Sequence, residues 1–203
     1  MPKLNILGLK VTKPDSFFRR PVCVSGFTLI ELMVTIAIIG IVALFGIPAF
    51  GDFVLNNRIR GQTSDFVVQL THARSEAMRT ATRVTVCPGG ESGCSGGNWE
   101  NGWVVFVDVS NIGVKDSEEI VLGVGPSLDG GNTLRSTAFA TYISFRHDGS
   151  STSIAGSGLA GSFVLCDSRG YGDKARAIAV NASGRAKTLP ANAAGSGVSN
   201  CGT

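Results

Sequence analysis

Two contrasting patterns of hydrophobic and polar residues divide the chain. Residues 27–50 are almost wholly apolar and carry one charged side chain, Glu31. About 20 apolar residues are enough to cross a bilayer as a helix, so this stretch predicts a transmembrane helix. Apolar residues then recur at intervals of three, four and seven from Phe53 to Ala77, which is typical of a helix with one buried face. We therefore expect one long helix over about 27–80, with 51–82 as the amphipathic continuation.

After Arg83 the pattern changes to alternation with a period of two, or to short apolar runs between glycine-rich breaks. Such patterns are typical of half-buried strands separated by turns. Strands that follow one long helix predict an α+β fold, with antiparallel sheets in a head over 83–203. The expected strands are 83–87, 102–109, 119–124, 133–138, 142–146, 162–166 and 176–181.

Pro48 lies within the apolar part of the predicted helix. Proline removes a backbone hydrogen bond and clashes with the preceding turn, so it kinks or locally melts a helix. An ordinary helix end is the alternative. The helical pattern resumes after Pro48, which favours a kink.

The first 26 residues carry five basic side chains against one acidic, a net charge of +4. Positive charge before a membrane segment keeps that end cytoplasmic and sends the other end out. In a secretory signal peptide the cleavage site follows the apolar core. Here the candidate site, Gly26, precedes the apolar run, so cleavage there would leave the membrane helix on the mature protein.

The run from Gly26 to Ile41 resembles the leader signal of type IV pilins and type II secretion pseudopilins. The resemblance implies that a prepilin peptidase cleaves after Gly26 and methylates the new terminal residue, Phe27. It also places the family's assembly glutamate on Glu31 and its common proline on Pro48. The mature chain is then a single-pass inner-membrane protein through 27–50, with its head in the periplasm until it enters a filament with other pilins or pseudopilins.

Glu31 is the one carboxylate in this apolar segment. An ionisable group inside a membrane helix is costly unless it is paired, so it indicates a functional site. The amino group that cleavage creates on Phe27, in the same or a neighbouring subunit, is the obvious partner. In the alternative reading, Glu31 only complements the helix dipole, which is worth ~0.3–1 kcal/mol.

Four of the five cysteines lie in the head, and an even number in an exported domain is typical of a disulfide framework. Cys87 and Cys94 enclose a short Gly/Ser/Pro loop, and a bond between Cys166 and Cys201 would hold the end of the chain on the sheet. Zinc is the alternative, but the spacing fits no common paired site. We expect no metal and no cofactor.

The head resembles the GspH/FimT family in three segments, 99–108, 143–149 and 177–187. Its two disulfide candidates and long tail are more similar to FimT and FimU minor pilins than to the secretion-system H component. Trp99 and Trp103 are expected in the core, and an aromatic carbohydrate platform is the weaker alternative.

Residues 169–203 carry a net charge of +4, with five basic residues against Asp173. Some FimT-like minor pilins carry a Gly-Arg-x-Arg motif implicated in DNA binding, and this chain resembles them with Gly184-Arg185-Ala186-Lys187. Positive charge suffices for contacts to phosphates without base specificity. The resemblance thus implies double-stranded DNA as a partner of Arg185 and Lys187, with Arg176 nearby. The alternative is an ordinary turn with solvated charges.

No catalytic motif stands out. The glycine-rich loop at 89–97 lacks the Gly-Lys-Ser/Thr ending of a phosphate-binding loop, and no nucleophile-elbow spacing occurs. We therefore expect a structural protein rather than an enzyme. The two functions that remain are a minor pilin that primes or caps a type IV pilus and takes part in DNA uptake, and the H pseudopilin of a type II secretion system.

Overall fold

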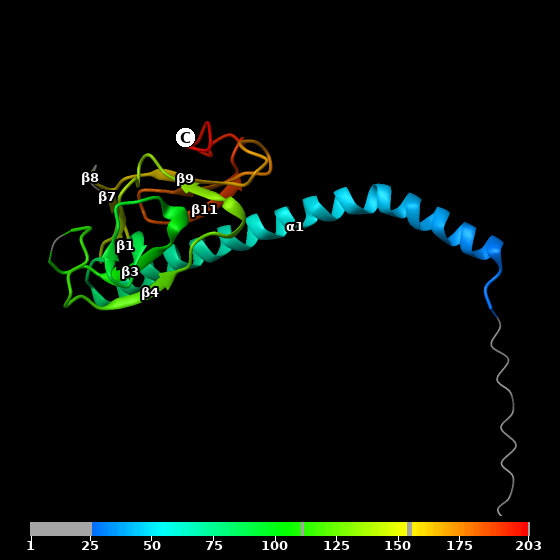
Figure 1. Cartoon of the computed structure of the whole chain (residues 1–203). Coiled ribbons are helices and arrows are strands. Elements are labelled where there is room, and N and C mark those ends of the chain that lie inside the picture. Colours follow the sequence, from blue (N-terminus) through cyan, green and yellow to red (C-terminus); the bar gives the residue numbers. More distant parts are fainter. Residues whose placement is uncertain (1–25, 111, 154–155, 203) are drawn as a thin grey trace, which may run out of the picture. The chain divides into compact units, whose positions relative to one another are not determined.

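The computed structural model describes residues 26–110, 112–153 and 156–202. The predicted leader before Gly26, including Cys23, lies outside the described residues. The chain forms two compact units, Met1–Phe45 and Gly46–Thr203, and one helix, α1 (Leu29–Thr80), contributes to both (Figure 1). The helix agrees with the predicted range to within two residues at its start.

The first unit contributes the apolar beginning of α1. An 18-residue window of this helix has a mean hydropathy of 2.6, and none of the window is buried. By length and composition α1 can therefore cross a membrane. The helix continues through Pro48 without a melted segment, and a bend at this proline stays a prediction.

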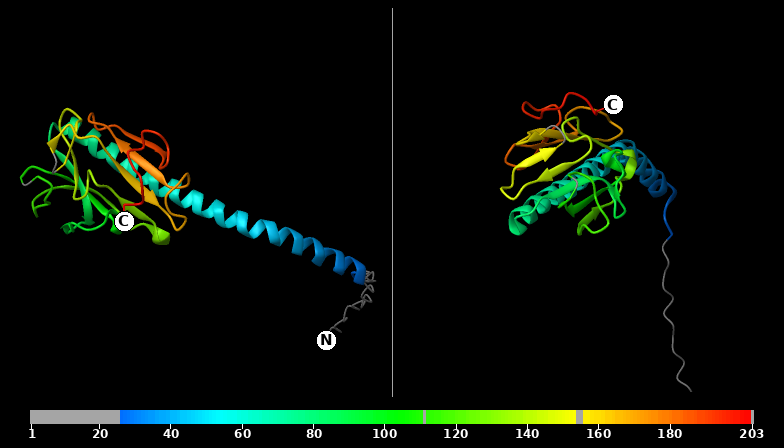
Figure 2. Two further views of the ribbon diagram at one scale, coloured as in Figure 1. Left: turned by 90° about the horizontal axis from the view of Figure 1, so that it is seen from above. Right: turned by 90° about the vertical axis from the view of Figure 1, so that its left-hand side faces the viewer.

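The second unit contains two antiparallel sheets (Figure 2). The larger sheet has the strand order β4-β3-β1-β6-β7-β8, with β2 paired to β1. The smaller sheet has the order β11-β10-β9-β5. The bounds of the larger sheet are β1 Val84–Gly90, β2 Gly93–Cys94, β3 Trp103–Val107, β4 Val121–Gly125, β6 Ile143–Phe145, β7 Ser151–Ser153 and β8 Gly156–Ser157. Those of the smaller sheet are β5 Thr133–Arg135, β9 Gly161–Cys166, β10 Arg176–Val180 and β11 Ala186–Pro190, and the 3-10 helices are η1 Trp99–Asn101 and η2 Asp129–Gly131.

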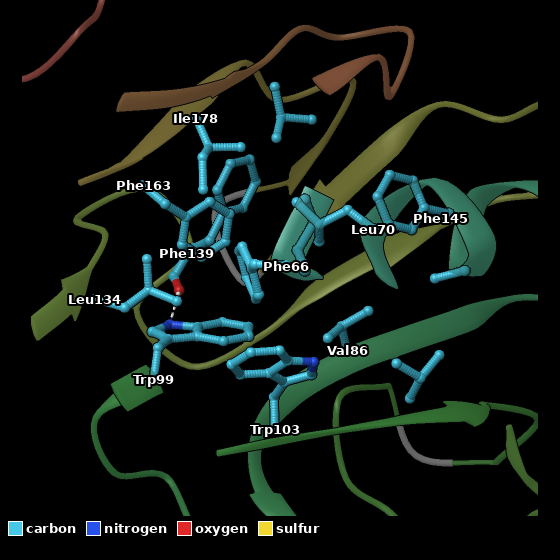
Figure 3. Close-up of a cluster of buried hydrophobic side chains, with 14 of the residues drawn as sticks. Phe66, Leu70, Val86, Trp99, Trp103, Leu134, Phe139, Phe145, Phe163 and Ile178 are labelled. Carbon is cyan, nitrogen blue, oxygen red and sulfur yellow. Dashed lines mark hydrogen bonds between the residues drawn. The ribbon is translucent and has the colours of Figure 1, made fainter. Parts of the chain in front are cut away.

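The second half of α1 packs on both sheets through one face, and Phe66 lies at the centre of the core (Figure 3). Its ring meets the rings of Trp103 and Phe163 edge to face, each at a centroid distance of 4.9 Å. Trp99 is also buried and donates from Nε1 to the carbonyl oxygen of Phe139 over 2.9 Å. These contacts confirm that both tryptophans belong to the core, so neither forms an exposed carbohydrate platform.

The seven predicted strands all exist, as β1, β3, β4, β5, β6, β9 and β10, although several are shorter than expected. The four additional strands carry weak patterns. Strands β2 and β8 have two residues each, and β7 is Ser-Thr-Ser. Strand β11, Ala-Lys-Thr-Leu-Pro, follows the turn at 182–183 and lies at the edge of its sheet. Apolar alternation does not identify such strands.

Two disulfides join Cys87 to Cys94 and Cys166 to Cys201. The second bond holds the chain end on the face of the smaller sheet that points away from α1, which we call the outer face. Val164 and Cys166 lie on this face, because their neighbours on β9 point into the core. The hydroxyl of Tyr171 adds hydrogen bonds of 3.1 Å to the carbonyl oxygens of Ala191 and Val198. A covalent bond and a local hydrogen-bond pair thus fix the tail.

Candidate functional site

The helix start contains the predicted processing and assembly residues. Gly26 and Phe27 precede α1 and are exposed, with 85% of Phe27 accessible. The backbone N–H of Glu31 donates to Thr28 Oγ1 over 3.2 Å, and the Thr28 N–H donates to Glu31 Oε2 over 3.5 Å. This reciprocal arrangement is a capping box, in which two otherwise unpaired N–H groups are satisfied at once.

The capping box gives Glu31 a structural role in addition to any role of its charge. The Ser/Thr-x-x-Glu spacing of Thr28 and Glu31 is a sequence signature of this motif, and the predicted pairing of Glu31 with an amine did not include it. The carboxylate is exposed in the isolated chain, so a neighbouring group can reach it. The position and the charge of Glu31 both fit an assembly contact. A variant that keeps the helix cap and removes the charge would separate the two roles.

The predicted DNA-binding residues lie around the hairpin of β10 and β11. Asn181 Oδ1 accepts hydrogen bonds from Ser183 Oγ at 2.8 Å and from the Arg185 N–H at 2.9 Å, so an asparagine side chain organises the turn. Gly184 has a φ of +75° and is buried. A Cβ at this position would lie 2.2 Å from the carbonyl oxygen of Gly149, so the close approach of two turns requires glycine.

Arg74 of α1 holds these two turns together. Its Nε donates to the carbonyl oxygens of Gly149 and Ser183, each over 3.0 Å. The guanidinium thus ties the helix to the turn between β6 and β7 and to the turn before Arg185. No short-range pattern marks Arg74 for this role, because its partners lie 75 and 109 positions further along the chain.

Arg185 and Lys187 are both exposed and lie on the outer face of the smaller sheet. Lys187 pairs with Ala179 across the β10–β11 ladder, whereas Arg176 pairs with Pro190. Because side chains alternate along a strand, Arg176 points to the opposite face, toward α1. The structure therefore brings Arg185 and Lys187 together and separates Arg176 from them.

A groove on the outer face begins at Arg185 and Lys187 and has a volume of about 750 Å³. Most of its lining residues are Gly, Ala or Ser, and none is acidic. Neighbouring phosphates would therefore meet positive charge without a nearby carboxylate. The lining includes Gly161, Ser162, Ala179, Gly195 and Gly197.

The cysteines that were candidate zinc ligands are all engaged in the two disulfides. Within the described ranges, no group of three or more His, Cys, Asp and Glu residues is arranged to hold a metal ion. The described residues offer two candidate sites: a capped helix start with an exposed carboxylate, and a basic hairpin beside a groove.

Comparison with known proteins identifies the family and the fold. Residues 62–184 match the family model "Type II transport protein GspH", and residues 23–47 match the "Prokaryotic N-terminal methylation motif". Crystal structures of the type IV minor pilin FimU of Pseudomonas aeruginosa share the fold. One has a TM-score of 0.56 at 15% identity and covers 73% of this chain and 98% of that chain.

Curated relatives match over a short segment of the chain. The type IV major fimbrial protein FimA of Dichelobacter nodosus is 56% identical over 34 residues, which are 17% of this chain. The chain spans only about a fifth of the length of the curated relatives it matches, 21% for FimA. The methylation motif implies processing by a prepilin peptidase. The GspH family model matches more than half of the residues, so the chain belongs to the GspH family of type IV pilin-like proteins, which are structural subunits rather than enzymes.

Proposed function

We propose that this chain is a minor subunit of a type IV pilus that contacts double-stranded DNA through Arg185 and Lys187. The observation that carries the DNA contact is the exposure of both side chains on one face, beside a groove whose lining includes no acidic residue. Lysine in the second position lacks the planar fork of arginine, but both side chains carry the positive charge that phosphates require, so we expect phosphate contacts without base specificity.

The assembly part of the proposal begins at the helix start. A prepilin peptidase cleaves after Gly26 and methylates Phe27, and the apolar part of α1 anchors the subunit in the inner membrane before assembly. Glu31 then pairs with a terminal amine in the filament. The methylation motif and the exposed position of these residues before α1 support this sequence of events.

An electrophoretic shift of duplex DNA by the head, residues 46–203, tests the DNA contact. Arg185→Gln/Lys187→Gln is expected to weaken binding at every sequence and to lower the slope of log affinity against log salt by about 2, because each phosphate contact contributes about 0.9. Arg176→Gln is the matched control, since Arg176 lies on the other face, and it should leave the shift unchanged. Binding of the double variant at wild-type affinity and salt slope would remove the proposal.

The second candidate is the H pseudopilin of a type II secretion system, which the match to the family of the type II transport protein GspH favours. Deletion of the gene separates the two when twitching, DNA uptake and protein secretion are scored in the same strain. Loss of twitching or DNA uptake with normal secretion supports the pilus, and the reverse supports the secretion system.

A further inference from the structure

A second basic site lies between α1 and the smaller sheet, on the side that faces away from Arg185 and Lys187. It is a cleft of about 420 Å³, and we call it the Arg60–Arg176 cleft. Besides these two arginines it is lined by three hydroxyl residues and one apolar residue, with no carboxylate among them. The lining residues are Arg60, Thr63, Ser64, Val67, Arg176 and Thr188.

The two guanidiniums of this cleft lack a counter-ion within the part of the chain that the structure describes. Arg176 Nε is buried without a hydrogen-bond partner, and neither arginine takes part in an ion pair there. A buried donor without an acceptor costs about 1–3 kcal/mol. An anionic group that enters the cleft would supply both the acceptor and the charge.

Apolar surface beside the cleft indicates that the anion belongs to a protein. Arg60, Ser64 and Val68 follow one another at intervals of four along α1, and 60% of Val68 is exposed. Arginine beside exposed apolar side chains is typical of protein–protein interfaces. A carboxylate on a partly apolar segment therefore fits the cleft better than a nucleic acid does.

The chain itself carries a segment of this kind between β3 and β4. Over residues 112–120 three acidic residues stand against Lys115, a net charge of −2. Glu118 is exposed, whereas Glu119 is buried and accepts from the backbone N–H groups of Val109, Ser110 and Asp116. Ile120 is 67% exposed and Val114 is 53% exposed, so this acidic loop combines an exposed carboxylate with apolar surface.

The acidic loop and the Arg60–Arg176 cleft lie at different ends of the second half of α1. Asp108, which lies between β3 and the acidic loop, is close to the helix end, because its N–H donates to the carbonyl oxygen of Arg83 over 2.9 Å. From Ser64 to Thr80 the helix rises about 24 Å. The loop therefore cannot reach the cleft of its own chain without unfolding, whereas a neighbouring copy can supply it.

We propose that the acidic loop of one copy of this chain docks into the Arg60–Arg176 cleft of a second copy. Glu118 and Asp116 then face the two guanidiniums, and Ile120 and Val114 cover Val68. The two surfaces differ, so the contact is head to tail, and such contacts generate rings or open filaments rather than closed symmetric dimers. The inference goes beyond the proposed function, since it names a self-contact that no DNA contact requires.

Cysteine cross-linking between two differently tagged full-length copies in detergent tests the contact. One copy carries Ser64→Cys in the cleft, and the other carries Ser117→Cys between Asp116 and Glu118; both serines are exposed. We expect the mixed pair to form a disulfide-linked dimer at least ten times more abundantly than either copy paired with itself. A mixed yield no higher than the same-site yields would overturn the proposal.

Charge reversal makes the test specific. Arg60→Glu on the Ser64→Cys copy should reduce the mixed dimer at least fivefold, and Glu118→Lys on the other copy should restore it. Both residues are exposed, so neither change threatens the core. Arg185→Glu/Lys187→Glu is the control and should leave the yield unchanged. Lack of rescue, or an equal loss in the control, would overturn the pairing, while the DNA shift and the deletion phenotypes report separately on the proposed function.

Discussion

Arg74 Nε donates a hydrogen bond of 3.0 Å to the carbonyl oxygen of Ser183 and so joins α1 to the turn immediately before Arg185. The same nitrogen also donates to Gly149 over 3.0 Å. One guanidinium on α1 thus holds the hairpin that carries the proposed DNA contact. Loss of this side chain should affect stability and binding in different degrees.

Arg74→Met should lower the free energy of unfolding of residues 46–203 by about 2 kcal/mol, because two carbonyls lose a charged donor. Urea denaturation measures this change, and amide exchange should increase at residues 183–185. Arg79→Met is the matched control, since Arg79 pairs with Glu76 on the exposed helix surface and such pairs contribute little. If both variants unfold at the wild-type midpoint, Arg74 does not fix the turn.

Gly184→Ala tests the close approach of the two turns. The new Cβ would lie 2.2 Å from the carbonyl oxygen of Gly149 at a φ of +75°, so strain and a clash add together. Gly195→Ala is a matched control, with a φ of +81° but open space around its Cβ. We expect Gly184→Ala to lower the midpoint of urea unfolding clearly more than Gly195→Ala does. Equal effects would show that only the backbone conformation matters.

Short-range patterns predicted the parts of this fold that rest on local chemistry. The apolar run before Phe50 and the amphipathic spacing after it marked α1, and alternation marked strands such as β3 and β10. Arg176 shows where this reasoning ends. Proximity in sequence grouped it with Lys187, but the register of β10 against β11 sends the two side chains to opposite faces. Arg74 likewise acts through two carbonyls more than 70 residues away, a relationship that exists only after folding.

The Asp167 carboxylate should make the free energy of unfolding of residues 46–203 fall in acid. Burial acts to raise the pKa of its carboxyl group, but hydrogen bonds and charge from Arg169 outweigh burial and hold this pKa below the ordinary value of 3.8. Arg169 also donates to Asn56 on α1 over 3.0 Å. Asp167 and Arg169 together therefore hold the loop between β9 and β10 against the helix. A group with a lowered folded-state pKa stabilises the fold above its ordinary pKa, and this contribution is lost as the pH falls through the folded-state value.

Asp167→Asn should therefore destabilise residues 46–203 by about 1–3 kcal/mol at pH 7, and the difference from wild type should shrink as the pH falls below about 4. Urea denaturation at a series of pH values measures both effects. Asp173→Asn is the comparison, because Asp173 pairs with Lys174 and both side chains are exposed, and its effect should be smaller throughout. A difference for Asp167→Asn that stays constant down to pH 2 would contradict the assigned role of its charge.

Glu31 allows the cap of α1 to be separated from the charge that filament assembly is proposed to need. Glutamine also completes a capping box with threonine, so Glu31→Gln keeps the bond to the Thr28 N–H and removes only the negative charge. Glu31→Ala removes both. We expect both variants to be cleaved after Gly26 and inserted in the membrane, since neither changes the leader or the apolar run.

If pairing with a terminal amine is the function of Glu31, Glu31→Gln should be as defective as Glu31→Ala in the filament fraction sheared from cells, measured by immunoblot against the membrane pool. Thr28→Val is the complementary variant, because it weakens the cap and keeps the carboxylate; it should still assemble. Normal assembly of Glu31→Gln together with failure of Thr28→Val would assign the residue to the helix cap. The carboxylate would then serve α1 itself, and the amine of Phe27 would need another partner.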